Sequence, residues 1–342
     1  MPFALVTMRR TMLVYAGIDE AGYGPLMGPL CVATSQWCIR DASDPLAPPD
    51  LWKLLQRAVC RSAKDRRGRI AINDSKKLKG TGVAGEHPMR AIERGVLASL
   101  TLHPTPPAIL ATDTELFAHL GVDDPALHAA WYAGSIALPW ACDRPRLQIA
   151  ESMLRSAAKS GAVASHTLAC KAVDAESINA AAQRGMVKTS IPWALLIQIV
   201  QALSAQWPTT AVRVAADRQS GRMRYLDDLM RAFPDDRLAI LHEDPLESIY
   251  RLDRAGAPAS APLVISFTVE GECGHLPIAL ASMTAKYTRE LWMARLNRWF
   301  SQHVHSLVPT AGYVKDGRRF LQVVRPTLAA QGLAETRLIR AI

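Results

Sequence analysis

Two adjacent carboxylates at the end of an apolar run constrain this chain more than any other feature. Residues 12–18 (MLVYAGI) are followed by Asp19 and Glu20, and the glycine-bracketed turn AGYGP begins directly after them. An apolar run of this length predicts a buried strand, and open α/β sheets usually place ligand sites at the carboxyl ends of their strands. Two neighbouring acids there could hold a hard divalent cation, although an Asp-Glu pair before glycine is also ordinary turn chemistry.

The turn after these acids has a second consequence. Adjacent strand residues point to opposite faces, so Asp19 and Glu20 can face one ligand only if the glycine-rich turn breaks the alternation. Gly22 and Gly24 permit such a break, and their lack of side chains lets backbone N–H groups approach a phosphate closely.

Three segments, in order, resemble the signature segments of the type 2 ribonucleases H, which cut RNA within RNA/DNA hybrids. They are residues 17–30 (GIDEAGYGPLMGPL), 73–78 (NDSKKL) and 281–290 (ASMTAKYTRE). A weaker fourth match is 175–179 (AESIN) with the helix-like run 194–200. The resemblance implies an α/β, RNase H-like fold with a central mixed β-sheet flanked by helices. It also implies an RNA/DNA hybrid or a ribonucleotide-containing duplex as the partner.

The resemblance implies four acids that hold two Mg2+ or Mn2+ ions: Asp19, Glu20, Asp217 and Glu272. Asp217 ends the apolar run 211–216; its alternative role is the N-cap of a helix that begins near Ser220. Glu272 stands where the family usually has Asp. Glu270 would share a strand face with Glu272, so either could be the fourth ligand, or both could lie at a solvated strand end.

Such an acid set suits phosphodiester hydrolysis. Two metal ions roughly 4 Å apart can activate a water molecule and neutralise charge on the leaving oxygen. Mg2+ prefers carboxylates and water, which fits a site without evident His or Cys ligands. The resemblance implies products with a 5'-phosphate and a 3'-hydroxyl.

The resemblance also implies a set of substrate-binding residues. In the glycine turn, Gly22, Tyr23 and Gly24 stand where bacterial relatives have Gly-Arg-Gly, the loop that reads a ribonucleotide–DNA junction. Tyr23 removes a charge and keeps a ring that can stack on sugar or base, so we expect weaker incision at a single embedded ribonucleotide. Tyr313 is expected either to contact deoxyribose or to pack internally. The expected phosphate or supporting groups are Ser75, Lys76, Ser282, Lys286 and Arg289, each Lys and Arg being otherwise solvated surface.

Charge is consistent with a nucleic-acid partner. The net charge is +9, with an isoelectric point near 9.4. Basic residues gather between 57 and 79, a run that could follow a duplex backbone or form solvated helix faces.

The matched segments span most of the chain, which predicts a single catalytic domain over residues 1–342. Residues of about 80–165 match poorly and predict an inserted, mainly helical subdomain, with helices at 114–120, 126–136 and 146–160. The aromatic residues Trp131, Tyr132 and Trp140 in it favour a core role over nucleic-acid contact. Residues of about 301–342 are expected to form a C-terminal extension that contacts substrate.

The remaining pattern alternates helices and strands. Helices are expected at 191–206, 225–233 and 277–300, and strands at 212–216, 238–242 and 263–269. The six cysteines have no Cys-x-x-Cys spacing, which argues against a zinc site or a disulfide framework. No apolar run has membrane-spanning length, and Arg9-Arg10 interrupts the N-terminal segment, so we expect a cytoplasmic protein without a membrane partner.

Three other classes compete with this interpretation. A dinucleotide-binding oxidoreductase is disfavoured because Gly28 is one position too late for the fingerprint and the acids would repel pyrophosphate. A noncatalytic hybrid-binding relative differs only in lacking metal-dependent cleavage. A structure-specific DNA nuclease differs only in not requiring the 2'-hydroxyl.

Overall fold

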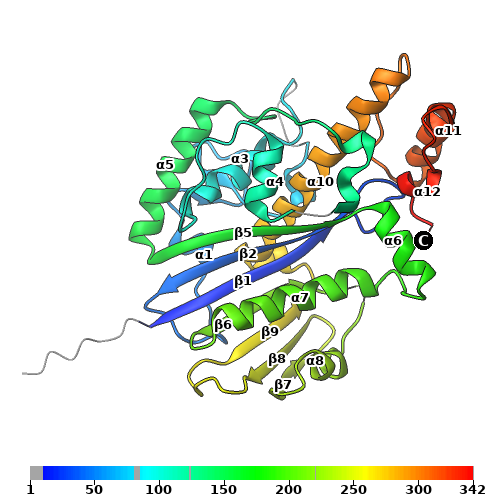
Figure 1. Ribbon diagram of the computed structural model, residues 1–342. Helices are drawn as coiled ribbons and strands as arrows, with labels where there is room; N and C mark the ends of the chain where they lie inside the picture. Colours follow the sequence, from blue (N-terminus) through cyan, green and yellow to red (C-terminus); the bar gives the residue numbers. More distant parts are fainter. Residues whose placement is uncertain (1–10, 81–84, 123–124, 220, 342) are drawn as a thin grey trace, which may run out of the picture.

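The computed structural model describes residues 11–80, 85–122, 125–219 and 221–341, arranged around a seven-stranded mixed sheet (Figure 1). The strand order is β5-β2-β1-β6-β9-β8-β7. The strands are β1 Met12–Ala21, β2 Leu30–Arg40, β5 Val163–Val173, β6 Ala211–Asp217, β7 Arg237–Glu243, β8 Glu247–Asp253 and β9 Leu263–Thr268. The predicted class, a mixed central sheet flanked by helices, is confirmed.

β1 lies in the middle of the sheet because its apolar side chains are buried on both faces. Every residue from 13 to 18 is buried. β1 pairs antiparallel with β2 and parallel with β6, and β6 pairs parallel with β9. The carboxyl ends of β1, β6 and β9 therefore meet at one edge of the sheet.

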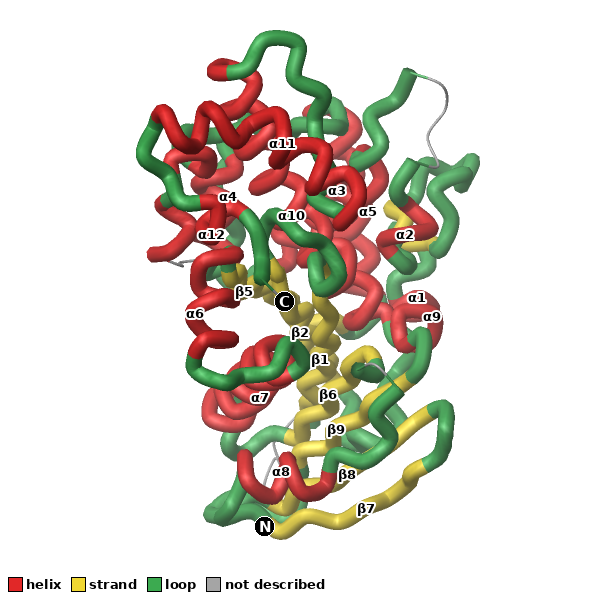
Figure 2. Tube along the Cα trace, turned by 90° about the vertical axis from the view of Figure 1, so that its right-hand side faces the viewer, coloured by secondary structure: helices red, strands yellow, loops and turns green. Residues whose placement is uncertain are grey.

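Helices cover both faces of the sheet (Figures 1 and 2). One face carries α3 Arg90–Ser99, α5 Arg144–Ser160 and α10 Leu276–His303, whose apolar side chains pack with those of β2 and β5. The other face carries α7 Ser190–Gln206 and α8 Leu226–Ala232. α10 begins so close to β1 that a methyl group on Gly17 would lie 2.1 Å from the backbone nitrogen of Ile278.

Shorter elements complete the fold. They are α1 Leu51–Leu54, β3 Val59–Cys60, β4 Ile70–Ala71, α2 Ser75–Leu78, α6 Ala175–Gln183, α9 Gly271–Gly274, α11 Val314–Ala330 and α12 Glu335–Leu338. β3 and β4 form a separate two-stranded parallel sheet. α12 packs against α6, near the carboxyl end of β1 (Figure 1).

The segment expected to be an insertion is helical and shares the core of the main sheet. It contains α3, the 3-10 turn η1 Leu100–Leu102, α4 Asp113–Leu120, the turns η2 Pro125–His128 and η3 Ala130–Tyr132, and α5. The helix expected over 126–136 is not formed: within its described part only these short 3-10 turns appear, because Ala129 and Ala133 on either side of η3 have extended backbone and Gly134 has φ 80°. Trp131 and Tyr132 are buried in the core and Trp140 packs against it.

One buried carboxylate joins this segment to the rest. Glu93 on α3 is 0% exposed. It accepts hydrogen bonds from the backbone N–H groups of Trp140, Ala141 and Cys142 at 2.5–2.6 Å and from the Tyr287 hydroxyl of α10 at 2.6 Å. The segment is thus fixed to α10 by polar contacts as well as by apolar packing.

The helices and strands expected in the second half are confirmed within a few residues, as α7, α8, α10, β6, β7 and β9. β8 has no counterpart among the expected strands. Its burial alternates with period 2, and its half-exposed face carries the charged residues Glu247, Arg251 and Asp253, so the segment has no apolar run. Within the described residues no helix combines the length and apolar character needed to cross a membrane. All six cysteines are unbridged.

Candidate active site

β1 and β6 bring Asp19 and Asp217 to the same edge of the sheet. Their parallel register pairs Ile18 with Ala216, so each aspartate is the next residue of its strand. Neighbouring strands lie about 4.8 Å apart, which places the two carboxyl groups close together. Burial, and then the charges of Glu20 and Asp217, raise the pKa of Asp19 well above its usual range.

Glu20 belongs to the same group, although the strand is not broken in the way the sequence suggested. β1 continues to Ala21, which pairs with Cys31 of β2, so the alternation persists through both acids. Pairing with β6 stops at Ile18, which leaves that side of Glu20 uncovered by a strand. Burial and the charge of Asp217 raise the pKa of Glu20 to about 7, while Lys76 opposes the shift.

The fourth acid comes from α9 and not from a strand. β9 ends at Thr268, and Glu270 has φ 50°, so the expected shared strand face of Glu270 and Glu272 does not exist. The chain turns here because the Gly271 N–H bonds Asp217 Oδ1 at 3.1 Å. Burial, followed by the charges of Asp217 and Asp74, raises the pKa of Glu272. Glu270 is exposed at the start of this turn. Of the two alternatives, Glu272 is the one whose carboxyl group interacts with Asp217.

Asp74 is a fifth acid at this edge and was not singled out from the sequence. It is 8% exposed, and its Oδ1 accepts a hydrogen bond from the backbone N–H of Lys76 at 2.8 Å as the N-cap of α2. Its charge raises the pKa values of Asp217 and Glu272. The Asn-Asp-Ser sequence before a short helix was the available signal, but it reads equally well as a cap alone.

α2 also supplies the polar partners of these acids. The hydroxyls of Ser75 and Ser282 lie 3.1 Å apart, and Ser282 donates a hydrogen bond to Asp19, which favours the charged carboxylate. Lys76 is exposed, and its charge lowers the pKa values of Glu20, Asp217 and Glu272. Lys76 therefore faces an edge where carboxylates outnumber cations.

The donor set suits a hard cation, but it is not assembled as a ligand cage. Carboxylate oxygens are the ligands that Mg2+ and Mn2+ prefer, and the mutual repulsion of these acids is what a divalent charge would offset. Among the described residues, however, no group of three or more His, Cys, Asp or Glu side chains is already arranged to hold a metal ion.

The glycine turn beside the acids depends on Gly22. This residue has φ +91°, and a methyl group on it would lie 2.5 Å from Pro29 O and 2.7 Å from Arg289 Cδ. Gly24 is exposed, and a methyl group there would meet nothing within 4 Å. The Tyr23 ring packs partly on the core, with Lys188 Nζ 5.0 Å from its centroid.

The other expected substrate-binding residues differ in their accessibility. Arg289 is 1% exposed and donates to Met27 O and Ala311 O, so it supports the glycine turn from behind and does not reach a phosphate. Of the two expected roles, phosphate contact or support, the burial of Arg289 on the inner face of α10 favours support. Lys286 is largely buried and pairs with Glu290 at 2.6 Å. Tyr313 is 54% exposed at the start of α11.

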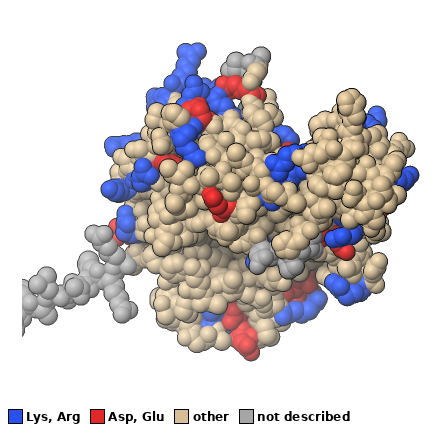
Figure 3. All heavy atoms as spheres, turned by 45° about the horizontal axis from the view of Figure 1, so that its top comes forward, with Lys and Arg blue, Asp and Glu red and all other residues tan. Residues whose placement is uncertain are grey.

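The basic run of residues 57–79 is only partly free to meet a duplex. Arg61 donates to Cys273 O and stacks on Trp52, Lys79 pairs with Glu290, and Arg69 pairs with Asp65. Figure 3 shows Lys and Arg side chains spread over several parts of one face instead of one continuous patch.

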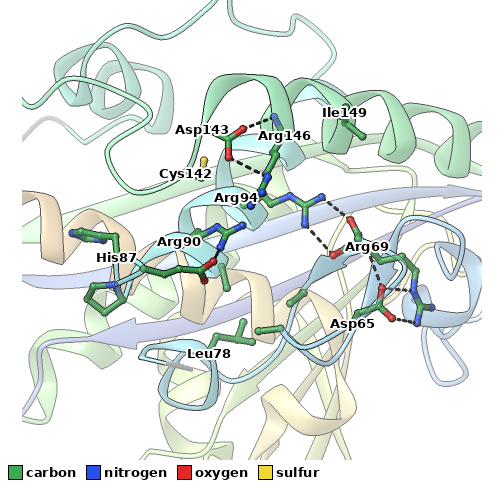
Figure 4. Close-up of a pocket in the computed structure, with 16 residues that line it drawn as sticks. Asp65, Arg69, Leu78, His87, Arg90, Arg94, Cys142, Asp143, Arg146 and Ile149 are labelled. Atoms are coloured by element: carbon green, nitrogen blue, oxygen red, sulfur yellow. Dashed lines mark hydrogen bonds and ion pairs between the residues drawn. The ribbon is translucent and has the colours of Figure 1, made fainter. Parts of the chain in front are cut away.

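A pocket of about 370 Å³ lies away from the acids, between the β3–β4 region, α3 and α5 (Figure 4). Four arginines line it, and each is engaged within the protein. Arg69 pairs with Asp65, Arg90 with Glu86 and Arg146 with Asp143, while Arg94 donates to the carbonyls of Gly68 and Arg69. None of the expected site residues lines this pocket.

Comparison with known proteins gives structural likenesses only. No family model and no curated protein matches the sequence. The chain is similar to RNase HII of Archaeoglobus fulgidus, solved with PCNA, with TM-score 0.42 and 14% identity over 96% of this chain and 94% of that one. It is similar to Bst-RNase HIII solved with Mn2+, with TM-score 0.42 and 17% identity over 100% of this chain and 70% of that one. It is also similar to ribonuclease H2 of Pyrococcus horikoshii OT3, with TM-score 0.39 and 13% identity over 95% of this chain and 92% of that one. Scores and identities this low assign no family.

Proposed function

We propose that this protein is a metal-dependent endoribonuclease that hydrolyses the RNA strand of RNA/DNA hybrids. The observation that supports the proposal is that Asp19 and Asp217 lie at one edge of the sheet and that Glu20 and Glu272 each interact electrostatically with Asp217, in a chain whose motifs resemble the type 2 ribonucleases H. The four carboxylates would hold two Mg2+ or Mn2+ ions, with Asp19 between them. Bound ions would activate water and neutralise the phosphate and the leaving oxygen.

The remaining residues have roles that follow from their contacts. Ser282, supported by Ser75, donates a hydrogen bond to Asp19 and orients its carboxyl group. Lys76 is exposed beside the acids and is placed to attract the phosphate backbone. Tyr23 within the glycine turn and the exposed Tyr313 offer rings to sugar or base. The products would carry a 5'-phosphate and a 3'-hydroxyl.

The test is cleavage of end-labelled duplexes with Mg2+ and with Mn2+. Three substrates of one sequence are compared: a continuous RNA/DNA hybrid, DNA with one embedded ribonucleotide, and DNA alone. We expect cutting of ribose-containing strands only, with the embedded ribonucleotide cut more slowly because Tyr23 lacks the charge and donors of arginine. Equal rates on the two ribose-containing substrates would contradict that role of Tyr23.

Asp19→Asn is the matched test of the site. We expect it to lower the cleavage rate at least about 100-fold and to leave hybrid binding intact, since it removes one charge from the reacting centre. Asp235→Asn is the control, because Asp235 is exposed in the loop after α8. Retained cleavage in Asp19→Asn would refute the site. Hybrid binding without any cleavage by the unaltered protein would favour a noncatalytic relative, and cutting of DNA alone would favour a DNA nuclease.

A further inference from the structure

Two buried arginines lie directly behind the glycine turn, and neither has been given a function above beyond support. Arg340, which is 3% exposed, donates through Nη1 to Gly22 O and through Nη2 to Gly28 O at 2.6 Å. Arg289 donates through Nη2 to Met27 O at 3.1 Å. Together these two side chains bond carbonyl groups at both ends of the segment 22–28, which contains the glycine turn.

These contacts set the direction of the peptide groups. In a planar trans peptide the C=O and the next N–H point in opposite directions. Because the Gly22 carbonyl points inward to Arg340, the N–H of Tyr23 points outward. The Tyr23 carbonyl lies 3.4 Å from the same guanidinium, which turns the N–H of Gly24 outward as well. Within the described part of the chain, neither N–H has an acceptor.

The outward side of this turn is open. Gly24 is exposed and has free space where a side chain would be, and Gly22 has the positive φ that brings successive N–H groups to one side. Successive N–H groups arranged in this way form a concave anion site. The turn directly follows β1, the strand that carries Asp19 and Glu20. An anion bound by the turn would therefore lie next to the candidate active site.

Arg340 is itself held by contacts that do not involve the turn's carbonyl groups at Gly22 and Gly28. The Asn179 side chain of α6 donates to Thr336 O and Ile339 O and accepts from the N–H of Ala341. A β-bridge between Met27 and Ile339 aligns the two segments. The guanidinium therefore approaches the turn from a fixed backbone.

We propose that Arg340 is a positioning residue that turns the N–H groups of Tyr23 and Gly24 toward a backbone phosphate of the bound nucleic acid. The identity of the ligand rests on the proposed function, whereas the orientation of the turn does not. Because the Tyr23 side chain carries no positive charge, the turn attracts phosphate through these backbone N–H groups.

The experiment compares Arg340→Met with Arg337→Met. Arg337 is the control because it lies three residues earlier and makes an exposed pair with Glu176. Amide hydrogen exchange of Leu26 and Met27, whose N–H groups bond Gly312 O, measures how firmly the segment is anchored. Affinity for a fluorescein-labelled RNA/DNA hybrid, measured in the Asp19→Asn background, reports phosphate binding, and kcat and KM are measured with Asp19 intact.

In Arg340→Met we expect exchange of the Leu26 and Met27 N–H groups to accelerate at least about 10-fold, because the segment loses its anchor. We expect hybrid affinity to fall about 10-fold and KM to rise in proportion, with kcat changed less than KM. Arg337→Met should match the unaltered protein in all of these. If Arg340→Met does not fold, Arg340→Lys is the substitute test. Its single ammonium group cannot bond both carbonyl groups as the guanidinium does, so we expect exchange rates and hybrid affinity between those of the unaltered protein and those expected for Arg340→Met.

Unchanged exchange in Arg340→Met would overturn the positioning role. Faster exchange with unchanged hybrid affinity would overturn the phosphate site. These results are separable from the proposed function: an unaltered protein that binds hybrid but cuts nothing refutes catalysis alone. One that binds no hybrid at all refutes both the function and the phosphate site.

Discussion

At the residue scale, His166 of β5 is a buried histidine held in its neutral form. Its ring centroid lies 4.1 Å from that of Trp37, and its nitrogens lie 3.1 Å from Ser35 Oγ and 3.3 Å from Ser99 O. Burial lowers its pKa from 6.5 to about 3. Between these pH values the unfolded chain binds a proton that the folded chain does not, so stability is lost as the pH falls.

His166→Gln tests this linkage. We expect the free energy of unfolding of the unaltered protein to fall about 1.4 kcal/mol per pH unit more steeply than that of the variant as the pH decreases below about 6. Denaturant titrations across this range measure the slopes, with the exposed His305→Gln as control. Parallel pH curves for His166→Gln and the unaltered protein would contradict a neutral buried His166.

The site residues differ in how far the sequence could predict their surroundings. Asp19 and Asp217 were predictable as neighbours because each directly follows an apolar strand, and parallel strands end at one edge. Asp74 was hidden by its second role as a helix cap, which gives the same local pattern with or without a nearby acid cluster. The choice between a phosphate contact and a supporting role for Arg289 could not be made from the sequence, because periodicity along α10 does not reveal that a separate turn covers its guanidinium.

At the scale of elements, the contact between α3 and the segment before α5 depends on a single carboxylate. Glu93 satisfies three backbone N–H groups and the Tyr287 hydroxyl in a site with no solvent exposure. In Glu93→Gln the side-chain NH2 group would face N–H or O–H groups that are themselves hydrogen-bond donors. We expect Glu93→Gln to lower the free energy of unfolding by about 3 kcal/mol.

Denaturant titration measures the effect of Glu93→Gln, with Glu176→Gln as control. Glu176 makes only an exposed ion pair with Arg337, which contributes at most about 1 kcal/mol. Two variants of equal stability would show that the buried carboxylate does not hold this junction.

Long elements with a clear period were predictable, and short ones were not. α10 and α7 follow from apolar patterns many residues long. α9 has four residues, too few for any period, and its position depends on the hydrogen bond from Gly271 to Asp217 on another strand. That is why Glu272 was assigned to a strand face that does not exist.

At the scale of the whole molecule, the positive net charge predicts a strong effect of salt on binding. Replacing Lys64 and Arg67, which are exposed and form no ion pair within the described residues, with Gln should reduce the slope of log affinity against log salt by up to about 1.8. Hybrid binding by the Asp19→Asn protein measures the slope. Lys159→Gln with Arg237→Gln, on α5 and at the start of β7, is the matched control, because both residues are exposed and form no ion pair within the described residues. A slope unchanged by the first pair would place the duplex elsewhere.

The hydrogen bond between Gly22 and Arg340 joins residues 318 positions apart. Contacts of such separation close late, because most of the chain must be ordered before they form. While the protein is being synthesised, the first strand and its acids leave the ribosome long before residue 340 exists. The nascent chain can therefore build the sheet while the turn beside its acids is still unformed, and competence for nucleic acid would arrive only with the final stage of folding.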